Sequence, residues 1–180
     1  MVEIDPLSAR SRIEVLSWVR RAVVERHLPD KLYIHLTERV PLALWQRAGK
    51  FVVVDRLGEV VPDALPEDFA SLLLIVGDDA PLHAAKLMAV FRQDPALARR
   101  IAAAVRIGGR RWNLRFDNGI DVRMPEEGLI EAWRRLAAFE RSKGLLAREI
   151  SALDLRIPDR LVVRPAKGAP TLVADDEKST

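Results

Sequence analysis

The stretch that decides the fold is RWNLRFDNGIDVRM, residues 111–124, where apolar and polar side chains alternate on both sides of Asn118 and Gly119. A two-residue loop would set Phe116 opposite Asp121 and so mix the two faces of a hairpin. A loop over residues 117–119 instead pairs apolar with apolar at each position: Phe116 with Ile120, Leu114 with Val122, and Trp112 with Met124. The sequence therefore predicts an antiparallel hairpin with Gly119 in the left-handed position of a bulge.

The residues after this hairpin predict a helix and then a last pair of strands. PEEGLIEAWRRLAAFERSKG, residues 125–144, carries acids at its start and basic residues at its end, which suits the helix dipole, and Gly144 can end it. Its apolar stripe holds Leu129, Trp133 and Leu136. LDLRIPDRLVVR, residues 153–164, then predicts a hairpin whose final strand, residues 161–164, has only one evident neighbour.

The residues before the hairpin predict a buried strand and two helices. SLLLIVG, residues 71–77, is a continuous apolar run, which predicts a strand covered on both faces. The helix that follows has Asp79 as its N-cap and Pro81 in its first turn. Its expected core residues are Leu82, Leu87, Val90 and Phe91. Pro95 ends this helix and begins a short helical turn that reaches Ile101.

The first third of the chain predicts a helix and two hairpins. Asp5 and Pro6 begin the helix, and the side chains expected on its buried face are Leu7, Ile13 and Leu16. The first hairpin keeps its apolar side chains on one face if it pairs Val24 with Ile34 and Ala22 with Leu36. Pro41 breaks the period, and KFVVVDRLGEVVP, residues 50–62, predicts a hairpin that turns at Gly58. This order of elements predicts an α+β fold built from antiparallel hairpins.

Composition narrows the possible classes of function. Of the 180 residues, 49% are hydrophobic and 31% charged, which is normal for a globular protein, and the net charge is +3. There is no cysteine, which excludes disulfides, thiolate metal sites and a cysteine nucleophile. No apolar run approaches the roughly 18 residues of a membrane span, and the first residues lack the pattern of a signal peptide. We therefore expect a chain without a membrane segment of its own.

No motif predicts catalysis or a cofactor. The histidines, His27, His35 and His83, lack partners at metal-ligand spacing. No phosphate-binding loop or nucleophile motif is present. The acid pairs at 78–79 and 126–127 stand where helices are predicted to start, and capping explains them. We expect a protein that is not an enzyme and binds no metal or cofactor.

Five arginines crowd the central hairpin and its approach: Arg106, Arg110, Arg111, Arg115 and Arg123. They form either a patch for an anion or acidic partner, or an ordinary solvated sheet face. A basic nucleic-acid-binding domain that uses this arginine-rich hairpin is the alternative function, but it would also need exposed aromatic side chains between the cations. Trp112 and Phe116 fall instead on the predicted buried face.

Several segments together resemble the FtsQ/DivIB family of bacterial cell-division proteins. The segments LSWVRRAVVERHLPDKLYIHLTERVPLALW, FVVVDRLGEVV, LLLIVG, RRWNLRFDNGIDVRM and LDLRIPDRLVVR occur in the order that the family shows. The resemblance covers most of residues 1–165, and ERVPLALW followed by VDRLGEVV is quite specific. The last hairpin has the form common in alphaproteobacteria.

The resemblance implies two domains of an α+β protein. Residues 1–43 would be the C-terminal part of a POTRA domain, a helix plus two strands, and residues 44–165 a mixed, mainly antiparallel β domain with two principal helices. Residues 166–180 would be a disordered tail, since they lack the apolar surface to fold. Family members carry an N-terminal transmembrane helix that this chain lacks, which implies an N-terminally truncated, periplasmic domain of a single-pass inner-membrane protein at the division site.

The resemblance further implies a non-catalytic scaffold that binds the partners FtsB and FtsL, with an FtsB segment added as a strand at the end of the β domain. An unpaired edge strand at residues 161–164 would suit this, because it offers main-chain donors and acceptors to another chain. The expected partner-binding residues are Arg156, Ile157, Arg160, Leu161, Val162, Val163 and Arg164, with Arg110 and Arg111 pairing with acids of the partner. Alternatively, the tail from Lys167 folds back over this edge.

Overall fold

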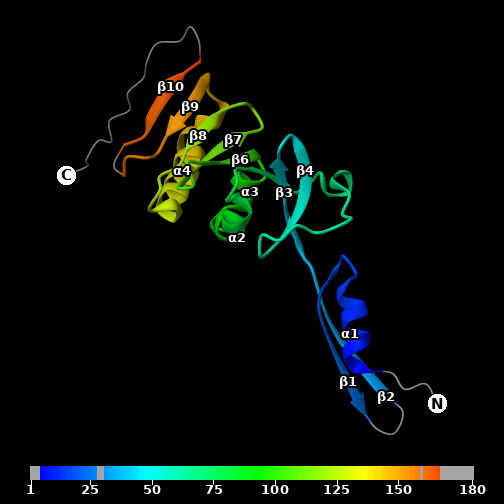
Figure 1. Cartoon of the computed structure of the whole chain (residues 1–180). Helices are drawn as coiled ribbons and strands as arrows, with labels where there is room; N and C mark the ends of the chain where they lie inside the picture. Colours follow the sequence, from blue (N-terminus) through cyan, green and yellow to red (C-terminus); the bar gives the residue numbers. More distant parts are fainter. Residues whose placement is uncertain (1–4, 28–30, 159, 167–180) are drawn as a thin grey trace.

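The described part of the chain contains two sheets, one of two strands near the N-terminus and one of eight strands after it (Figure 1). The structure is a computed structural model, and it describes residues 5–27, 31–158 and 160–166. The expectation of a disordered tail at 166–180 lies outside the described residues except for Ala166, and so does the expectation that the tail covers the last strand.

The first unit is a helix packed on a hairpin. Helix α1 (Pro6–Glu14) begins where predicted, because the Asp5 carboxylate accepts hydrogen bonds from N–H groups of the first turn. Strands β1 (Val19–His27) and β2 (Lys31–Glu38) pair antiparallel. Their register is the predicted one, with Ala22 opposite Leu36 and Val24 opposite Ile34.

The buried face expected in this unit is not formed. Leu7 and Leu16 are 72% and 59% exposed, and α1 has no buried residue. Ile34 and Leu36 are both about half exposed, although Ala22 is fully buried. The prediction was wrong because two strands and one short helix are too few to enclose a core.

The larger sheet has the strand order β10-β9-β8-β7-β6-β5-β3-β4. Its strands are β3 (Pro41–Arg47), β4 (Lys50–Asp55), β5 (Leu73–Val76), β6 (Ile101–Ile107), β7 (Arg111–Phe116), β8 (Asp121–Arg123), β9 (Ile150–Asp154) and β10 (Val162–Pro165). The neighbours β3–β5, β5–β6 and β8–β9 are parallel, and the remaining pairs are antiparallel. The sheet is therefore mixed and mainly antiparallel, as predicted.

Three α-helices lie along one face of this sheet (Figure 1). They are α2 (Ala80–Phe91), α3 (Pro95–Ala98) and α4 (Leu129–Lys143), and the 3-10 helices η1 (Pro66–Phe69) and η2 (Leu145–Ala147) lie in connections. Trp133 of α4 is fully buried, and its ring centroid lies 4.8 Å from that of Phe91 on α2. The core thus joins the two principal helices to the sheet.

The central hairpin has the predicted loop of three residues. The paired apolar positions are Leu114 with Val122, Phe116 with Ile120, and Trp112 with Met124. All of these side chains are buried, so the hairpin forms the middle of the core. Gly119 has a φ of +85°, in the left-handed region that side chains other than glycine adopt only with strain.

The first strands of the larger sheet differ from the prediction. The antiparallel partner of β4 is β3, whereas the segment after Gly58 reaches β4 through an isolated bridge between Val54 and Val60. Pro41 begins β3 rather than breaking the structure, since proline is tolerated as the first residue of a strand. Gly58 does turn the chain with a φ of +82°, as predicted.

The middle of the sheet also departs from the prediction. The helical turn from Pro95 stops at Ala98, and Ile101 begins β6, a strand that the sequence did not predict. Strand β5 is not covered equally on both faces: Ile75 is fully buried, but its neighbours Leu74 and Val76 are only partly buried. The helices pack on the face of the sheet to which Ile75 belongs, and among the described residues no second layer covers the other face.

Three expectations about helix ends and faces were met only in part or were wrong. Asp79 is the N-cap residue of α2, as predicted, but its side chain caps no N–H group and instead accepts a hydrogen bond from Arg106 Nε at 3.1 Å. Leu82 is 69% exposed, since it lies on the outer side of α2. The acids at 126–127 do not cap α4, which begins after Gly128 without a side-chain cap.

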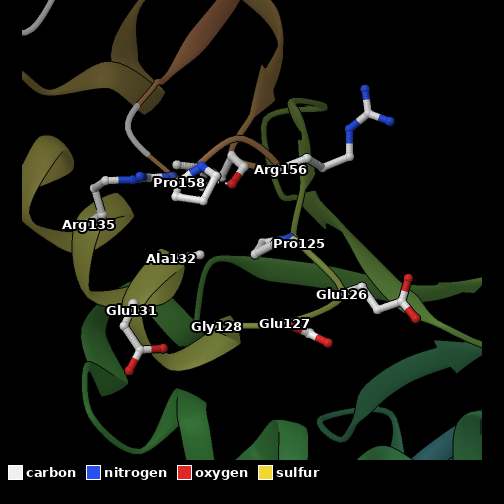
Figure 2. A pocket seen from close by; sticks show the side chains of 10 residues that line it. Pro125, Glu126, Glu127, Gly128, Glu131, Ala132, Arg135, Arg156 and Pro158 are labelled. Carbon is white, nitrogen blue, oxygen red and sulfur yellow. Dashed lines mark hydrogen bonds between the residues drawn. The ribbon is translucent and has the colours of Figure 1, made fainter.

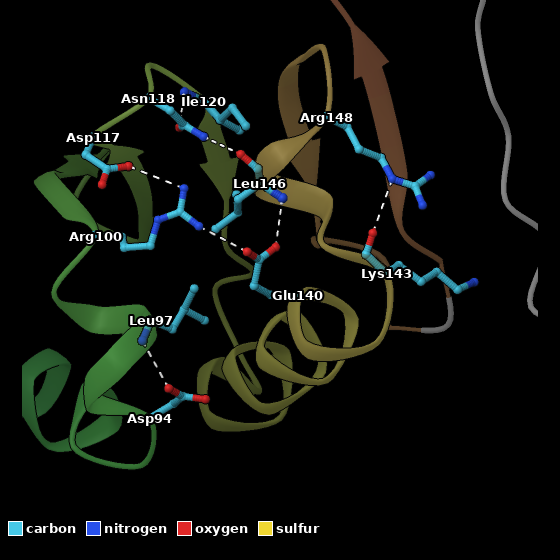
Figure 3. A network of polar contacts seen from close by, with 10 residues as sticks. All are labelled: Asp94, Leu97, Arg100, Asp117, Asn118, Ile120, Glu140, Lys143, Leu146 and Arg148. Carbon is cyan, nitrogen blue, oxygen red and sulfur yellow. Dashed lines mark hydrogen bonds and ion pairs between the residues drawn. The ribbon is translucent and has the colours of Figure 1, made fainter.

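A polar network joins α4 to the central hairpin and to the approach to β9 (Figure 3). The Glu140 carboxylate accepts a hydrogen bond from Arg100 Nη1 at 3.0 Å and another from the Leu146 N–H at 2.7 Å. Arg100 also lies 3.5 Å from the carboxylate of Asp117, in the hairpin loop. Glu140 therefore fixes the position of η2, from which the chain enters β9.

Replacing Glu140 with glutamine is expected to lower the free energy of unfolding by about 1–2 kcal/mol, because charge-assisted hydrogen bonds that are partly shielded from water lose their charge. Chemical denaturation would measure the loss. Glu131→Gln is the matched control, since Glu131 lies on the same helix, is exposed, and makes no ion pair within the described part of the chain. Equal effects of the two substitutions would contradict a role for the network.

Candidate partner-binding edge

Strand β10 is the outermost strand of the larger sheet. It pairs antiparallel with β9, setting Val162 opposite Asp154 and Val163 opposite Leu153. Figure 1 shows it beside β9 at the far end of the molecule from the N-terminus. Among the described residues β9 is its only strand neighbour, so one side of β10 carries main-chain groups that no described strand pairs.

The direction of these groups follows from the bonds of β9. The N–H of Leu155 donates to the carbonyl of Arg123, toward β8. Because main-chain groups alternate sides along a strand, Leu153 also faces β8, whereas Asp154 and its neighbours at even positions face β10. The N–H and carbonyl of Val162, opposite Asp154, are thus directed toward β9. We infer that Val163 directs its N–H and carbonyl outward, away from the sheet.

Side chains of the C-terminal edge, defined as residues 160–165, differ in their exposure. Val162 is 52% exposed, and Arg160 and Arg164 are also exposed. Val163 is partly buried and packs against the core. Leu161 is only 7% exposed within the core, so its side chain is not available to a partner and only its main chain could contribute.

Arg156 precedes the C-terminal edge and is held by Asp154. Its Nε and Nη2 donate to the two oxygens of the Asp154 carboxylate at 2.9 and 2.6 Å, and its N–H adds a third bond at 3.1 Å. Partial burial raises the pKa of Asp154, but the bonds from Arg156 and the charge of Arg123 outweigh it, so this pKa lies below its ordinary value. Arg156 is therefore preoriented, while the adjacent Ile157 is 51% exposed.

The depressed pKa of Asp154 predicts a pH dependence. A carboxylate whose pKa falls on folding adds stability above its unfolded pKa, with an ordinary value of 3.8 for aspartate, and loses it as the pH falls through the folded pKa. We expect the Arg156 side chain to become mobile in that acidic range, and in Asp154→Asn to be mobile at neutral pH. NMR titration of the Asp154 carboxyl carbon would measure the pKa on which this expectation depends. A midpoint at or above 3.8 would contradict the assignment.

A groove of about 720 Å³ lies beside this segment (Figure 2). It is lined by Pro125, Glu126, Glu127, Gly128, Glu131, Ala132, Arg135, Leu155, Arg156 and Pro158. Arg135 of α4 donates to the carbonyls of Leu155 and Ile157 at 3.2 Å each, which holds the 155–158 segment against the helix. Sequence reasoning missed this groove because its walls come from segments that only the α4 packing brings together.

The other two predicted arginines lie farther away. Arg110, in the turn before β7, is exposed and lies 3.9 Å from Glu126 at the rim of the groove. Arg111 begins β7, three strand positions from β10, which is about 14 Å at the usual strand spacing. Arg110 thus borders the groove, and Arg111 does not lie next to the C-terminal edge.

The arginines of the central hairpin are mostly paired with acids of the same chain. Arg106 pairs with Asp79 at 3.1 Å, Arg115 with Asp121 at 2.7 Å, and Arg123 with Asp154 at 3.7 Å. The aromatic side chains of this hairpin, Trp112 and Phe116, are buried in the core, and the Arg106 guanidinium lies over the Trp112 ring with its Cζ 5.3 Å from the ring centroid. This arrangement is that of a solvated sheet face with internal ion pairs rather than a row of free cations and aromatics.

The fold and its open edge define a two-unit protein of mixed-sheet architecture, and the described residues include no group of three or more histidine, aspartate or glutamate side chains that could hold a metal ion. The model of the family described as "Cell division protein FtsQ/DivIB, C-terminal" matches residues 43–156, and that of "POTRA domain, FtsQ-type" matches residues 1–39. The chain belongs to the FtsQ/DivIB family of cell-division proteins.

Curated relatives support this membership. Cell division protein FtsQ of Rhizobium radiobacter is 34% identical over 94% of this chain and 80% of that protein. FtsQ of Bradyrhizobium diazoefficiens is 36% identical over 92% of this chain and 48% of that protein, and FtsQ of Rhizobium meliloti is 37% identical over 91% and 53%. The chain spans about half the length of most of these relatives.

A solved structure is also similar, that of the major extracytoplasmic domain of the cell-division protein DivIB from Geobacillus stearothermophilus. It has a TM-score of 0.41 and 11% identity, and covers 62% of this chain and 99% of that one. Within the described ranges, no helix has both the length and the apolar character needed to span a membrane.

Proposed function

We propose that this chain is a non-catalytic scaffold of the division machinery, which captures segments of FtsB and FtsL by strand addition at β10. One observation carries the proposal: β10 ends the sheet, and its outer side is unpaired by any described strand. A partner segment in extended conformation would accept the outward N–H of Val163 and donate to its carbonyl. Membership in a cell-division family supports this role.

The side chains around β10 specify the chemistry of the partner segment. Val162 is an exposed apolar contact on the strand, and Ile157 is another just before it. Arg160 and Arg164 are exposed cations beside them, and Arg156 is held ready by Asp154. We propose that the added strand alternates apolar and acidic side chains, so that the acids pair with these arginines.

The setting of the scaffold belongs to the same proposal. The relatives extend beyond the region that this chain matches, and the chain belongs to the same cell-division family. We propose that the chain is the periplasmic domain of a single-pass inner-membrane protein at the division site. Its proposed domain limits are 1–43 and 44–165, with β3 crossing the boundary.

A binding experiment with the periplasmic segment of FtsB tests the proposal. Calorimetry would compare the intact chain with a chain truncated before residue 159, which lacks β10. We expect binding to the intact chain and none to the truncated one. The periplasmic segment of FtsL, titrated separately and then with FtsB present, would show which partner the edge binds. Equal binding of FtsB to both chains would place its site elsewhere.

The same material tests nucleic-acid binding by the arginine-rich hairpin. Phosphate contacts would make the affinity for single-stranded DNA fall steeply as salt rises. Because Arg115 and Arg123 are paired with acids, we expect no binding to DNA at physiological salt. Salt-sensitive binding that Arg115→Ala weakens would support the nucleic-acid alternative instead.

A further inference from the structure

A second groove lies at the opposite end of the helical layer from β10. Its volume is about 580 Å³, and it opens where β3, β5 and β6 begin. It is lined by Leu42, Ala70, Ser71, Leu72, Leu73, Met88, Phe91, Arg92, Pro95, Ala98, Arg99, Ile101 and Ala102. We call it the arginine-rimmed groove. Phe91 and Ile101 are buried, while Met88 and Leu73 are partly exposed toward it.

The charges of this groove have one sign. Arg92, at the C-cap of α2, and Arg99, at the C-cap of α3, are its only charged lining residues, and both are exposed. Neither makes an ion pair within the described part of the chain. The nearest acid in sequence, Asp94, is already engaged by Arg141 at 2.6 Å and by the Leu97 N–H. The groove therefore combines an apolar lining with two cations that have no ion-pair partner within the described part of the chain.

The backbone also departs from regular pairing at this place. The ladder between β6 and β7 shifts register between Ile101 and Ala103, so that Ala102 is an unpaired bulge residue at the wall of the groove. Bulges are frequent beside functional sites because they redirect a strand. Ala98 and Ala102 contribute only small side chains to the lining of the groove.

We propose that the arginine-rimmed groove is a second docking surface, for a short segment of another protein that carries an apolar side chain between acids. The apolar side chain packs on Met88 and Leu73, and the flanking carboxylates pair with Arg92 and Arg99. Charge complementarity decides the occupant, since a basic segment would place cations beside unpaired arginines. The surface is separate from β10, so the scaffold can hold two partners at once.

The test uses the full chain with labelled methyl groups and two synthetic peptides. One is Glu-Asp-Glu-Leu-Phe-Glu-Asp-Glu, and the other replaces each acid with lysine. We expect the acidic peptide to shift the methyl resonances of Met88, Leu73 and Ala98 saturably, and the lysine peptide to bind at least tenfold more weakly. Equal shifts from both peptides, or none at Met88, would overturn the proposal.

Charge reversal provides the matched variants. The double substitution Arg92→Glu, Arg99→Glu is expected to exchange the preference between the two peptides, while Arg56→Glu, at an exposed arginine elsewhere, leaves it unchanged. Vesicles of phosphatidylglycerol form a further arm. Shifts at Met88 from vesicles but not from the acidic peptide would overturn the proposal in favour of a lipid. If the chain truncated before residue 159 still binds the acidic peptide, the peptide site is the arginine-rimmed groove and not the β10 edge.

Discussion

Replacing Val163 with proline is expected to weaken FtsB binding at least about tenfold, equivalent to about 1.4 kcal/mol, while the domain stays folded. The outward N–H of Val163 is the donor that an added strand needs, and proline removes it. The bonds between β9 and β10 remain, because they use Val162 and its neighbours at even positions. Proline is close to valine in size, so the partly buried side chain is largely preserved.

Two neighbouring variants sharpen this test. Val162→Pro removes an N–H that faces β9, so it is expected to loosen β10 itself, seen as faster hydrogen exchange in β9. Val162→Ala keeps every main-chain group and trims an exposed side chain, so it is expected to weaken binding only about twofold to fivefold. Unchanged FtsB affinity in a folded Val163→Pro protein would rule out strand addition at β10.

Replacing Trp133 with alanine is expected to cost about 3–5 kcal/mol of unfolding free energy, the largest loss of any substitution considered. Trp133 is fully buried and packs against Phe91, so alanine leaves a cavity between α4, α2 and the sheet. Thermal unfolding would show a fall in Tm of roughly 10 °C. Much of the stability of a typical domain would be lost.

Two control substitutions distinguish the effect of the cavity at Trp133 from the effect of losing the indole N–H. The Nε1 of Trp133 is buried and has no hydrogen-bond partner among the described residues. Trp133→Phe removes this unpaired donor and keeps an aromatic ring, so it is expected to cost at least about 2 kcal/mol less than alanine. Trp18→Ala, at a position that is 40% exposed, is expected to cost about 1 kcal/mol or less. Equal losses at Trp133 and Trp18 would contradict the assigned core.

The sequence predicted best where one face of a hairpin must be apolar. The loop at 117–119 and the pairing of Leu114 with Val122 followed from that requirement alone, because a shift of one residue would bury charges. The register of β1 with β2 was confirmed for the same reason. The predicted burial of one face of the β1–β2 hairpin was not confirmed. Burial depends on what covers the hairpin, and the alternation of side chains does not specify that.

Strand β6 was missed because three of its seven residues, IAAAVRI, are alanines, which have little preference for strands. It is held by neighbours on both sides, β5 and β7, so the sheet stabilises what local preference does not. Strand β3 was missed because Pro41 signals a break when its position at the start of a strand is not known. In both cases tertiary pairing decided the outcome.

The last hairpin was visible in the sequence, but the chemistry of its edge was not. The alternating apolar residues predicted a last hairpin, and β10 lies close to the predicted residues 161–164, at the end of the sheet. The first strand of that hairpin was predicted too late in the chain, because β9 ends at Asp154 and residues 155–157 lie in the connection. Which residue directs its main chain outward depends on the bond between Leu155 and Arg123, which joins segments separated by the whole of α4. The burial of Leu161 likewise follows from packing that the sequence does not specify.

The parallel contact between β8 and β9 has a consequence for how the protein becomes competent. The chain joins β8 to its parallel neighbour β9 through the crossover helix α4, which packs on the sheet through Trp133. A nascent or damaged molecule in which α4 is not packed on the sheet would therefore lack an ordered β10 edge. Under the proposed strand addition, such a molecule would not bind the partner segment until folding is complete. Native-state hydrogen exchange should then give β9 and α4 the same opening free energy, and a much lower value for β9 alone would separate the two events.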